Sequence, residues 1–394
     1  MSHDRILRSQ DDVHAYVGRT CFKTGPPRLV GLEAEWHVVD RRCPGDPVPL
    51  SRLRAAVDRS VPLPAGSTVS YEPGGQLELS TAPARGVSAA CGRLSADLDV
   101  VSRALDDAGL CRIGQGVDPL RPPNRQLDSP RYAAMAAFFD LRHPTAGAGP
   151  QMMCSTASVQ VNVDTGTDTA GPHGLRERWR LANTLGPVLV AAFANSPLCG
   201  GRPTGWRSTR QAIWASLDPG RTRPPAPGDP VDAYTRYALD AEVMLVRRPH
   251  GEWVTAPGMR FRDWLDGRTR FGHPTEDDLG YHLTTLFPPV RPKGWLELRT
   301  VDAQPGDGWQ VAAAVVTAVL DDPVAADIAR DVTAPVAGRW QQAARLALAD
   351  PALAVAARAC FTAALDALPR LGAASLVPAV AAYADSYVAR GRCP

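Results

Sequence analysis

Four short segments of this chain alternate apolar and polar residues with a period of two. Successive side chains of a β-strand point to opposite faces, so each segment predicts a strand with one apolar and one polar face. Strands of this kind belong in an antiparallel sheet that buries one face. The polar faces hold Glu33 and Glu35 in 29–39, Glu78 in 76–80, Gln160 and Asn162 in 158–164, and Glu297 and Arg299 in 295–299.

The acidity of these polar faces is their unusual property. Any one strand taken alone is explained by a solvated sheet face, which normally mixes acids with basic residues and threonine. Here three of the four faces present glutamate and one contains a basic residue. Carboxylates that converge from several strands repel each other and call for compensating cations. Carboxylate and amide oxygens suit Mg²⁺ or Mn²⁺ rather than zinc. We therefore expect two or more such ions, with a triphosphate bound to them.

Phosphate binding needs other groups as well, because the chain has no GxxxxGK[ST] loop, and Gly114-Gln115-Gly116 is too short to indicate a dinucleotide site. A nucleotide would then be held through metal and arginine. Segment 205–214 interleaves arginine with tryptophan and ends at Trp214. A solvated basic helix is an equally good interpretation of this segment. Its arginines and one that follows could clamp a phosphate or a carboxylate: Arg207, Arg210 and Arg221.

Arg299 has a different position. It lies two residues after Glu297 on the same predicted face, beside the expected metal ligands. There it could stabilise charge on a phosphoryl group during transfer. An ion pair between Glu297 and Arg299 with only a structural role is the alternative.

Composition argues against several other functions. Lys and Arg total 43 against 41 for Asp and Glu, so the formal charge of +2 gives no overall field to recruit nucleic acid or an anionic membrane. The charged N-terminus lacks the apolar core of a signal peptide, and apolar stretches such as 311–320 are expected to be too short to span a bilayer. We expect a cytoplasmic protein.

Cysteine and histidine give no sign of a zinc site or a disulfide framework. The eight cysteines include no CxxC pair, and the eight histidines form no HExxH motif. We expect reduced thiols. His37 shares the polar face of Glu33 and Glu35, where an ordinary strand-end histidine is favoured over a partner of the metal ligands.

The chain is expected to form one catalytic domain, 1–394. Its first part, 1–306, mixes strand-like runs with Gly- and Pro-rich loops and contains the site, whereas 307–394 is rich in alanine and is expected to form helices packed on that core. Apolar spacing predicts helices within 86–109 and 171–194. Surface loops or lids are expected at 41–49, 141–150 and 221–232.

Four motifs, in this order, resemble those of the bacterial glutamate-cysteine ligases. The likeness extends from about Gly31 through Gln304 and is weakest in the alanine-rich C-terminus. Judged by the Glu-Pro-Gly-Gly-Gln-Leu-Glu block and the 206–214 region, the chain is most similar to the actinobacterial type that supplies γ-glutamylcysteine for ergothioneine biosynthesis. The motifs are Gly31-Leu32-Glu33-Ala34-Glu35, Glu72-Pro73-Gly74-Gly75-Gln76-Leu77-Glu78-Leu79-Ser80, Ala157-Ser158-Val159-Gln160-Val161-Asn162 and Leu296-Glu297-Leu298-Arg299.

The resemblance implies an α+β fold similar to glutamine synthetase and the guanido kinases, a curved antiparallel β-sheet with metals on its concave face and helices outside. It implies Arg299 and Glu33 as catalytic residues, and 207–214 as the segment that contacts substrate and nucleotide. Some relatives have histidine in the third motif, and its absence here leaves the ligand set of one metal open. The implied metal ligands are Glu33, Glu35, Glu72, Glu78 and Glu297, with Gln160 or Asn162 on the strand that completes the site.

The implied reaction uses ATP and Mg²⁺, with Mn²⁺ as a substitute, to join the γ-carboxylate of L-glutamate to the amine of L-cysteine through γ-glutamyl phosphate. A lid at 141–150 could protect that intermediate from water, although an ordinary loop fits the composition equally well. The alternatives are a related ligase with another amine acceptor, a guanidino phosphotransferase, and a non-catalytic nucleotide or amino-acid binding module.

Overall fold

A single large antiparallel sheet forms the centre of the molecule. The computed structural model describes residues 5–142, 147–247 and 253–394. Within these residues the sheet has eight strands, in the order β2-β3-β1-β6-β10-β9, and the long strand β1 also pairs with β4 and β5. The strands are β1 (Leu29–Asp40), β2 (Thr68–Tyr71), β3 (Leu77–Ser80), β4 (Ala84–Arg85), β5 (Leu110–Ile113), β6 (Ser158–Val163), β9 (Val290–Pro292) and β10 (Leu296–Asp302).

The four predicted strands are confirmed as β1, β3, β6 and β10, and they are consecutive neighbours in the sheet. Their pairing places polar residues side by side, because residues opposite each other in neighbouring strands lie on the same face. Glu35 is paired with Glu78 and Glu33 with Gln160. Glu297 is paired with Asn162. The register of strand pairing therefore places the polar side chains of the four strands next to one another in one continuous patch.

The apolar face of the sheet is covered by three helices, α3 (Val87–Asp107), α6 (Leu175–Phe193) and α12 (Gly308–Asp321). The first two confirm the helices predicted within 86–109 and 171–194. Leucine, valine and alanine side chains of both layers are buried and form one continuous core. The sheet and these helices are thus held together by burial of apolar surface.

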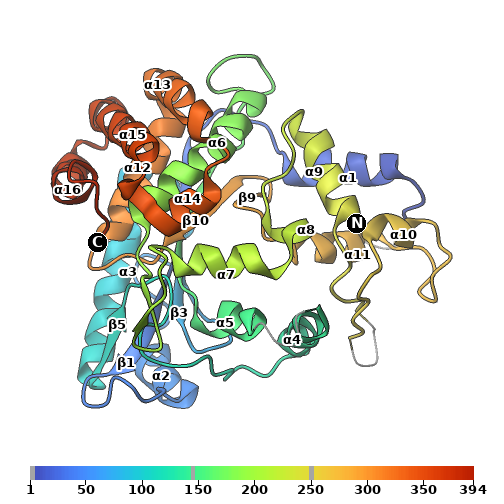
Figure 1. Ribbon diagram of the computed structural model, residues 1–394, viewed down its shortest axis with the longest axis horizontal. Helices are drawn as coiled ribbons and strands as arrows, with labels where there is room; N and C mark the ends of the chain where they lie inside the picture. Colours follow the sequence, from blue (N-terminus) through green and yellow to red (C-terminus); the bar gives the residue numbers. More distant parts are fainter. Residues whose placement is uncertain (1–4, 143–146, 248–252) are drawn as a thin grey trace.

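The alanine-rich C-terminal segment is helical, as predicted, and forms a further layer around α6 and α12, seen in orange and red in Figure 1. Small side chains let its helices approach closely. At Gly186 of α6, an added Cβ atom would lie 2.0 Å from the ring of Trp340. The layer consists of α13 (Pro323–Thr333), α14 (Trp340–Leu346), α15 (Pro351–Arg370) and α16 (Val377–Tyr383).

Helix α15 is the one helix of the described residues that is long and apolar enough to cross a membrane, with a mean hydropathy of 1.4. The expectation that apolar stretches are too short was therefore wrong for this helix, in which Arg358 and Asp366 interrupt the apolar run. In the structure 56% of its apolar window is buried, and it packs against α6, α12 and α13. A core helix of a soluble protein passes the same test.

The polar face of the sheet is enclosed by shorter elements. Figure 1 shows α4, α5 and α7 to the right of β1, β3 and β5, and α1, α9, α10 and α11 to the right of β9. The remaining elements are α1 (Gln10–Cys21), α4 (Pro130–Arg142), α5 (Ala148–Ser155), β7 (Leu198–Cys199), β8 (Arg202–Pro203), α7 (Thr209–Leu217), α8 (Pro219–Thr222), α9 (Pro230–Asp240), α10 (Phe261–Leu265) and α11 (Glu276–Leu283), together with α2 (Leu50–Val57), which packs against α3.

The three predicted loops have different outcomes. Segment 41–49 lacks regular structure up to the start of α2 and is mostly exposed. The prediction of a surface loop at 221–232 is wrong for its first residue, because Arg221 is completely buried and belongs to α8. In segment 141–150 the ends join α4 and α5, and residues 143–146 lie outside the described residues.

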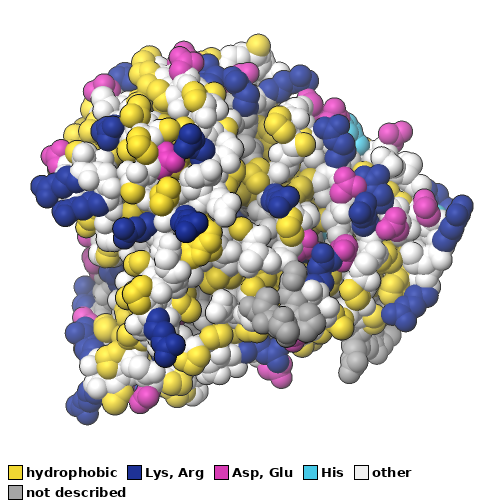
Figure 2. All heavy atoms as spheres, in the orientation of Figure 1, with side chains coloured by type: hydrophobic (Ala, Val, Ile, Leu, Met, Phe, Trp, Pro, Cys, Tyr) yellow, Lys and Arg dark blue, Asp and Glu magenta, His cyan; other side chains and the backbone are white. Residues whose placement is uncertain are grey.

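Surface charge and thiols agree with the composition. Figure 2 shows Lys and Arg interspersed with Asp and Glu over the visible face, without a large region of one sign. All eight cysteines are unpaired. Four of them, Cys21, Cys91, Cys154 and Cys360, are buried, and Cys43 is exposed.

Candidate active site

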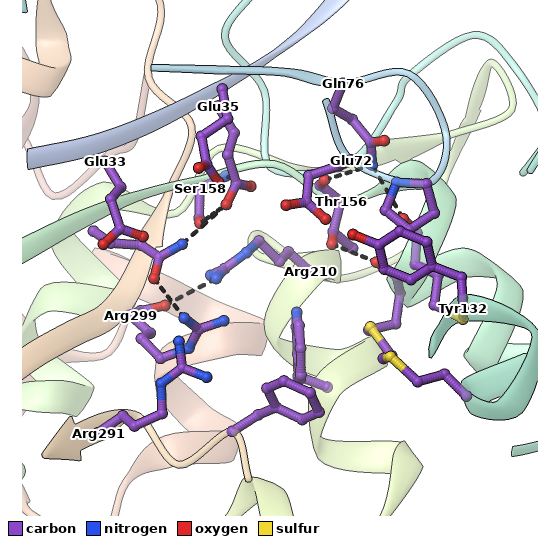
Figure 3. Close-up of a pocket in the computed structure, with 18 of the residues that line it drawn as sticks. Glu33, Glu35, Glu72, Gln76, Tyr132, Thr156, Ser158, Arg210, Arg291 and Arg299 are labelled. Carbon is purple, nitrogen blue, oxygen red and sulfur yellow. Dashed lines mark hydrogen bonds between the residues drawn. The ribbon is translucent and has the colours of Figure 1, made fainter. Parts of the chain in front are cut away.

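A cavity of about 200 Å³ lies over the polar patch of the sheet. Four glutamates line it: Glu33 and Glu35 from β1, Glu78 from β3, and Glu72 from the turn that precedes β3. Four arginines line it as well: Arg131 from α4, Arg210 from α7, Arg291 from β9 and Arg299 from β10. Figure 3 shows the carboxylates of Glu33, Glu35 and Glu72 on one side and the guanidinium groups opposite them.

Glu72 reaches the cavity through a tight turn, 72–76. The amide of Gly75 donates to the carbonyl of Glu72 at 2.8 Å, and the amide of Glu72 donates to the carbonyl of Gln76 at 2.9 Å. Gly75 has φ of 85°, which favours glycine. Gly74 meets the backbone of α5, since an added Cβ atom would lie 2.1 Å from the carbonyl oxygen of Cys154. The two glycines thus allow the turn to form and to pack against α5.

Three acids of the cavity, Glu33, Glu35 and Glu72, hold protons more tightly than usual. Burial, together with the charge of Glu78, raises the pKa of Glu35 to about 7. Burial and the charges of Glu35 and Glu78 raise the pKa of Glu72 to about 8. Burial also raises the pKa of Glu33, with a further contribution from Glu297. This excess of buried negative charge is the property that a bound cation would relieve.

Glu35 is fixed in place by β6. Its carboxylate accepts hydrogen bonds from the amide of Ser158 at 2.8 Å, the hydroxyl of Ser158 at 3.1 Å and Nε2 of Gln160 at 3.0 Å. Oε1 of the same Gln160 accepts from Arg299. Gln160 therefore links the acidic and basic sides of the cavity.

Glu297 is neutralised by basic side chains. It is completely buried and accepts from Arg291 at 2.6 and 3.1 Å, from Lys293 at 3.0 Å and from Arg299 at 3.0 Å. Burial alone would raise its pKa, but these three cations hold the pKa well below its usual range. Glu297 lies beneath the arginines rather than among the residues that line the cavity.

Arg210 is a buried guanidinium with donors to spare. Nη2 donates to the carbonyl of Arg299 at 2.9 Å, whereas Nη1 has no hydrogen-bond partner in the described structure. The nearest acid, Asp302, is 3.7 Å from Nη1, beyond hydrogen-bonding distance. Asp302 itself accepts from Ser196 at 2.7 Å and from Ser208, the N-cap residue of α7, at 2.9 Å. An incoming carboxylate or phosphate could satisfy Arg210.

Two of the predicted anion-binding arginines do not reach the cavity. Arg207 is exposed and does not line it. Arg221 lies elsewhere in the interior, where it donates to Asp218 at 2.9 Å and to the carbonyls of Thr285 and Glu242 at 2.8 and 2.7 Å. Its burial serves the fold. Trp214, in contrast, lines the cavity as expected.

Asn162 is directed to a second cavity, of about 490 Å³, that borders the first. Its Nδ2 donates to Glu33 at 3.0 Å, and its Oδ1 accepts from the indole of Trp295 at 3.0 Å. Leu29, Pro83 and Trp295 give this second cavity a largely apolar lining. Glu33 lines both cavities and so marks the place where they meet.

Several residues of the site were missed by the sequence interpretation. Arg291 and Lys293 belong to the hairpin of β9 and β10, and Arg291 is the direct partner of Glu297 in its register. Pairing the run Val290–Pro292 with 296–302 would have found Arg291. Arg131 and Tyr132 of α4 also line the cavity. The sequence of this helix contains no motif that would indicate a role in the site.

The donors present fit a hard divalent cation. Carboxylate oxygens are the ligands that Mg²⁺ prefers, and the raised pKa values indicate uncompensated negative charge. In the described part of the chain no three Asp, Glu, His or Cys side chains already converge as a metal site. The side chains of Glu33, Glu35, Glu72 and Glu78 would therefore have to turn toward a cation.

Comparison with known proteins shows the family of this chain. The model of the family "Glutamate-cysteine ligase family 2(GCS2)" matches residues 29–394. Glutamate–cysteine ligase EgtA of Mycobacterium tuberculosis is 44% identical over 387 residues, which cover 96% of this chain and 87% of that protein. The EgtA protein of Mycolicibacterium smegmatis is 45% identical over 367 residues, 92% of this chain and 85% of that one.

A solved structure supports the fold. The crystal structure of a glutamate–cysteine ligase from Francisella tularensis in complex with AMP has a TM-score of 0.52 to this chain, at 13% identity. The match covers 91% of this chain and 82% of that one. From the family match and the two mycobacterial relatives, this chain belongs to glutamate-cysteine ligase family 2.

Proposed function

We propose that this protein is an ATP-dependent glutamate–cysteine ligase, which joins the γ-carboxylate of L-glutamate to the amine of L-cysteine. The observation that carries the proposal is the cavity in which Glu33, Glu35, Glu72 and Glu78 oppose a set of arginines. Such a site can hold anionic substrates and cations together. The family and the named activity of the mycobacterial relatives support this assignment.

The reaction consists of two displacements. In the first, a γ-carboxylate oxygen of glutamate forms a bond to the γ-phosphorus of ATP, and the bond to ADP breaks. The acyl phosphate that results has a leaving group that a free carboxylate lacks. In the second, the amine of cysteine attacks the acyl carbon, gives up one proton and expels inorganic phosphate, leaving the amide bond of γ-glutamylcysteine.

The arginines have distinct proposed roles. Arg299 stabilises the phosphoryl group, because its guanidinium is aimed from β10 into the cavity and stands beside Gln160. Arg210, whose buried Nη1 has no hydrogen-bond partner among the described residues and faces Asp302 at 3.7 Å, binds a substrate carboxylate, and Trp214 of the same helix forms part of the wall. Both roles concern binding and charge, which are the main contributions of a protein to phosphoryl transfer.

Magnesium, or manganese in its place, would be held by Glu33, Glu35, Glu72 and Glu78, with Glu297 as a fifth candidate that its basic partners would first have to release. Gln160 and Asn162 lie on the strand between these acids. When bound, the cations would neutralise phosphate charge that otherwise opposes attack by one anion on another.

We place the nucleotide base in the second cavity. Its size of about 490 Å³ and its lining of Leu29, Pro83 and Trp295 suit an uncharged aromatic ring. Lys23 stands at its edge as a candidate phosphate contact. Glu33, which lines both cavities, then lies between nucleotide and amino acids, consistent with the catalytic role proposed for it.

Three broader assignments rest on resemblance. The sheet is proposed to share its curved architecture with glutamine synthetase and the guanido kinases. The dipeptide is proposed to supply ergothioneine biosynthesis, and the protein to act in the cytoplasm. A ligase with another amine acceptor is the nearest alternative, since the acidic patch contacts phosphate and does not select the amine. A phosphorylated guanidine product, or binding without turnover, would indicate the phosphotransferase or the binding module.

The test is ADP release by the purified protein with Mg²⁺, ATP and glutamate, with and without cysteine, together with mass detection of the dipeptide. We expect cysteine-dependent turnover, and a loss of about 10²-fold or more in Glu33→Gln. Glu177→Gln, at a half-buried position of α6 that does not line the cavity, is the matched control and keeps full activity. Absence of turnover with every amine tested would reject the ligase.

A further inference from the structure

The main cavity has two chemically different sides. In Figure 3 the labelled Arg291 and Arg299 stand on one side, and the sulfur atoms lie near Tyr132 on the other. The sulfur-containing residues that line the cavity are Met135 of α4 and Met152 and Met153 of α5. One side is therefore charged, and the other presents thioethers.

The three methionines are well packed rather than loosely exposed. They are 5%, 6% and 4% exposed, in the order Met135, Met152 and Met153, and belong to a compact apolar cluster behind the cavity. Trp214 and Phe287 continue the same wall. Met135, Met152 and Met153 are called the methionine wall below. A thioether is soft, polarisable and a weak hydrogen-bond acceptor, so this wall suits an uncharged group.

The methionine wall is fixed relative to the acidic patch. Nε2 of Gln76, at the end of the Glu72 turn, donates to the carbonyl of Thr156 at 2.9 Å and to that of Met153 at 3.5 Å. The hydroxyl of Thr156 donates to the carbonyl of Met152 at 2.7 Å. A ligand held at the acids therefore meets the methionines at a constant distance.

The proposed substrates offer one small uncharged group to such a wall. Glutamate ends in two carboxylates and an ammonium group, and the phosphates of ATP are anionic. The acceptor amino acid, however, must bring its amine to the acyl phosphate on the charged side while its own side chain extends elsewhere. We propose that Met135, Met152 and Met153 bind the side chain of the acceptor and select a thiol over a hydroxyl; this inference rests on the proposed ligase function.

The physical basis is desolvation. A thiol is a weak hydrogen-bond donor and loses little when it leaves water, whereas the hydroxyl of serine would be buried against thioethers that replace its water contacts poorly. An apolar wall of this kind rejects a hydroxyl analogue by about 10²-fold. The acceptor 2-aminobutyrate, which has a methyl group in place of the thiol, should therefore be used far better than serine.

The experiment measures kcat/KM of the full-length protein for cysteine, 2-aminobutyrate and serine at saturating ATP and glutamate. Met152→Gln, Met153→Gln and Met135→Gln are made separately, so that a single variant that fails to fold does not decide the outcome. Each is expected to lower the cysteine-to-serine ratio by about tenfold, because the amide can hydrogen-bond the hydroxyl. The KM values for ATP and glutamate stay unchanged.

The controls separate specificity from general damage. Met259→Gln, at a half-buried position away from the cavity, leaves the acceptor ratio at its wild-type value. Met152→Leu, which conserves volume and apolar character, retains the preference for cysteine over serine.

Two results would overturn the proposal while leaving the ligase intact. One is an unchanged acceptor ratio in all three glutamine variants. The other is a rise in KM for ATP alone, which would show that the methionine wall packs against the nucleotide base. If wild-type protein forms no dipeptide with any acceptor, the proposed function and this inference both fail.

Discussion

Two buried glutamates of the site show how neighbours decide the state of a carboxyl group. Glu297 is surrounded by Arg291, Lys293 and Arg299, and its pKa is far below the ordinary value. Burial, together with the charges of Glu35 and Glu78, raises the pKa of Glu72 to about 8. The same side chain is thus stabilised as an anion in one place and destabilised in the other.

The position of Glu72 leads to a test of function against stability. We expect Glu72→Gln to lower ligase activity by about 10²-fold, because one proposed cation ligand is lost. Without divalent cations at pH 8, however, the variant should unfold at the same temperature as wild type or higher, because a buried charge among acids is removed. Thermal unfolding and ADP release measure the two effects. A variant with much lower stability and normal activity would contradict the assignment.

The raised pKa values also predict how stability depends on pH. For Glu35 and Glu72 the folded pKa values of about 7 and 8 lie above the ordinary glutamate pKa of 4.5. The folded protein therefore holds protons that the unfolded chain has released, and stability falls as pH rises toward 8. Buried His37 and His282, with pKa lowered to about 4 and 3, act oppositely but only below about pH 6.5.

The pH effect is best measured between pH 6.5 and 8 with a chelator present. The free energy of unfolding should fall by on the order of 1 kcal/mol per pH unit, and added Mg²⁺ should flatten the dependence. A chelated protein whose melting temperature does not change across this window would show that the acids are not coupled as described.

At the scale of elements, the turn before β3 connects the sheet to α5. Gly74 lies so close to Cys154 that a Cβ atom would overlap its carbonyl oxygen. We expect Gly74→Ala to displace the turn, to cost about 1–3 kcal/mol of stability and to reduce kcat by misplacing Glu72. Gly92→Ala in α3, where the added atom meets nothing within 4 Å, is the control and should be neutral or slightly stabilising.

Urea unfolding measures the stability of the Gly74→Ala and Gly92→Ala variants, and steady-state kinetics measures their kcat. Equal stability and equal kcat for Gly74→Ala and wild type would show that the turn does not depend on this close contact.

The elements that sequence predicted well are those whose pattern has a local cause. Alternation identified β1, β3, β6 and β10, and their acids were expected on one face. The alternation of arginine and tryptophan nearby predicts Arg207 and Arg221 in the site. The direction in which each side chain points, however, depends on tertiary packing, which a local sequence pattern does not determine. Arg221 is held by Asp218 and by two carbonyls distant in sequence, which is information that only the fold contains.

At the scale of the molecule, the site depends on layers that are far apart in the sequence. Asp302 of β10 accepts from Ser196, after α6, and from Ser208, which begins α7. Helix α6 is itself packed between the sheet and the C-terminal helices. The cavity therefore relies on the alanine-rich segment although that segment contributes no residue to its lining.

This dependence predicts one cooperative unfolding unit for residues 1–394. Near-UV circular dichroism, far-UV circular dichroism and loss of activity should give the same thermal midpoint, because the helical layer and the sheet share one apolar core. Two separated transitions would contradict the single domain and divide the chain near residue 307.

The burial of the thiols has a consequence for chemical durability. An enzyme that handles free cysteine is exposed to thiol–disulfide exchange with its own substrate, and that exchange requires an accessible thiolate. Burial raises the pKa of Cys21, Cys91 and Cys360 to about 12, so these groups remain protonated as well as shielded. Mixed disulfides with substrate should thus be confined to surface positions such as Cys43, far less damaging to the core than capture of an interior thiol.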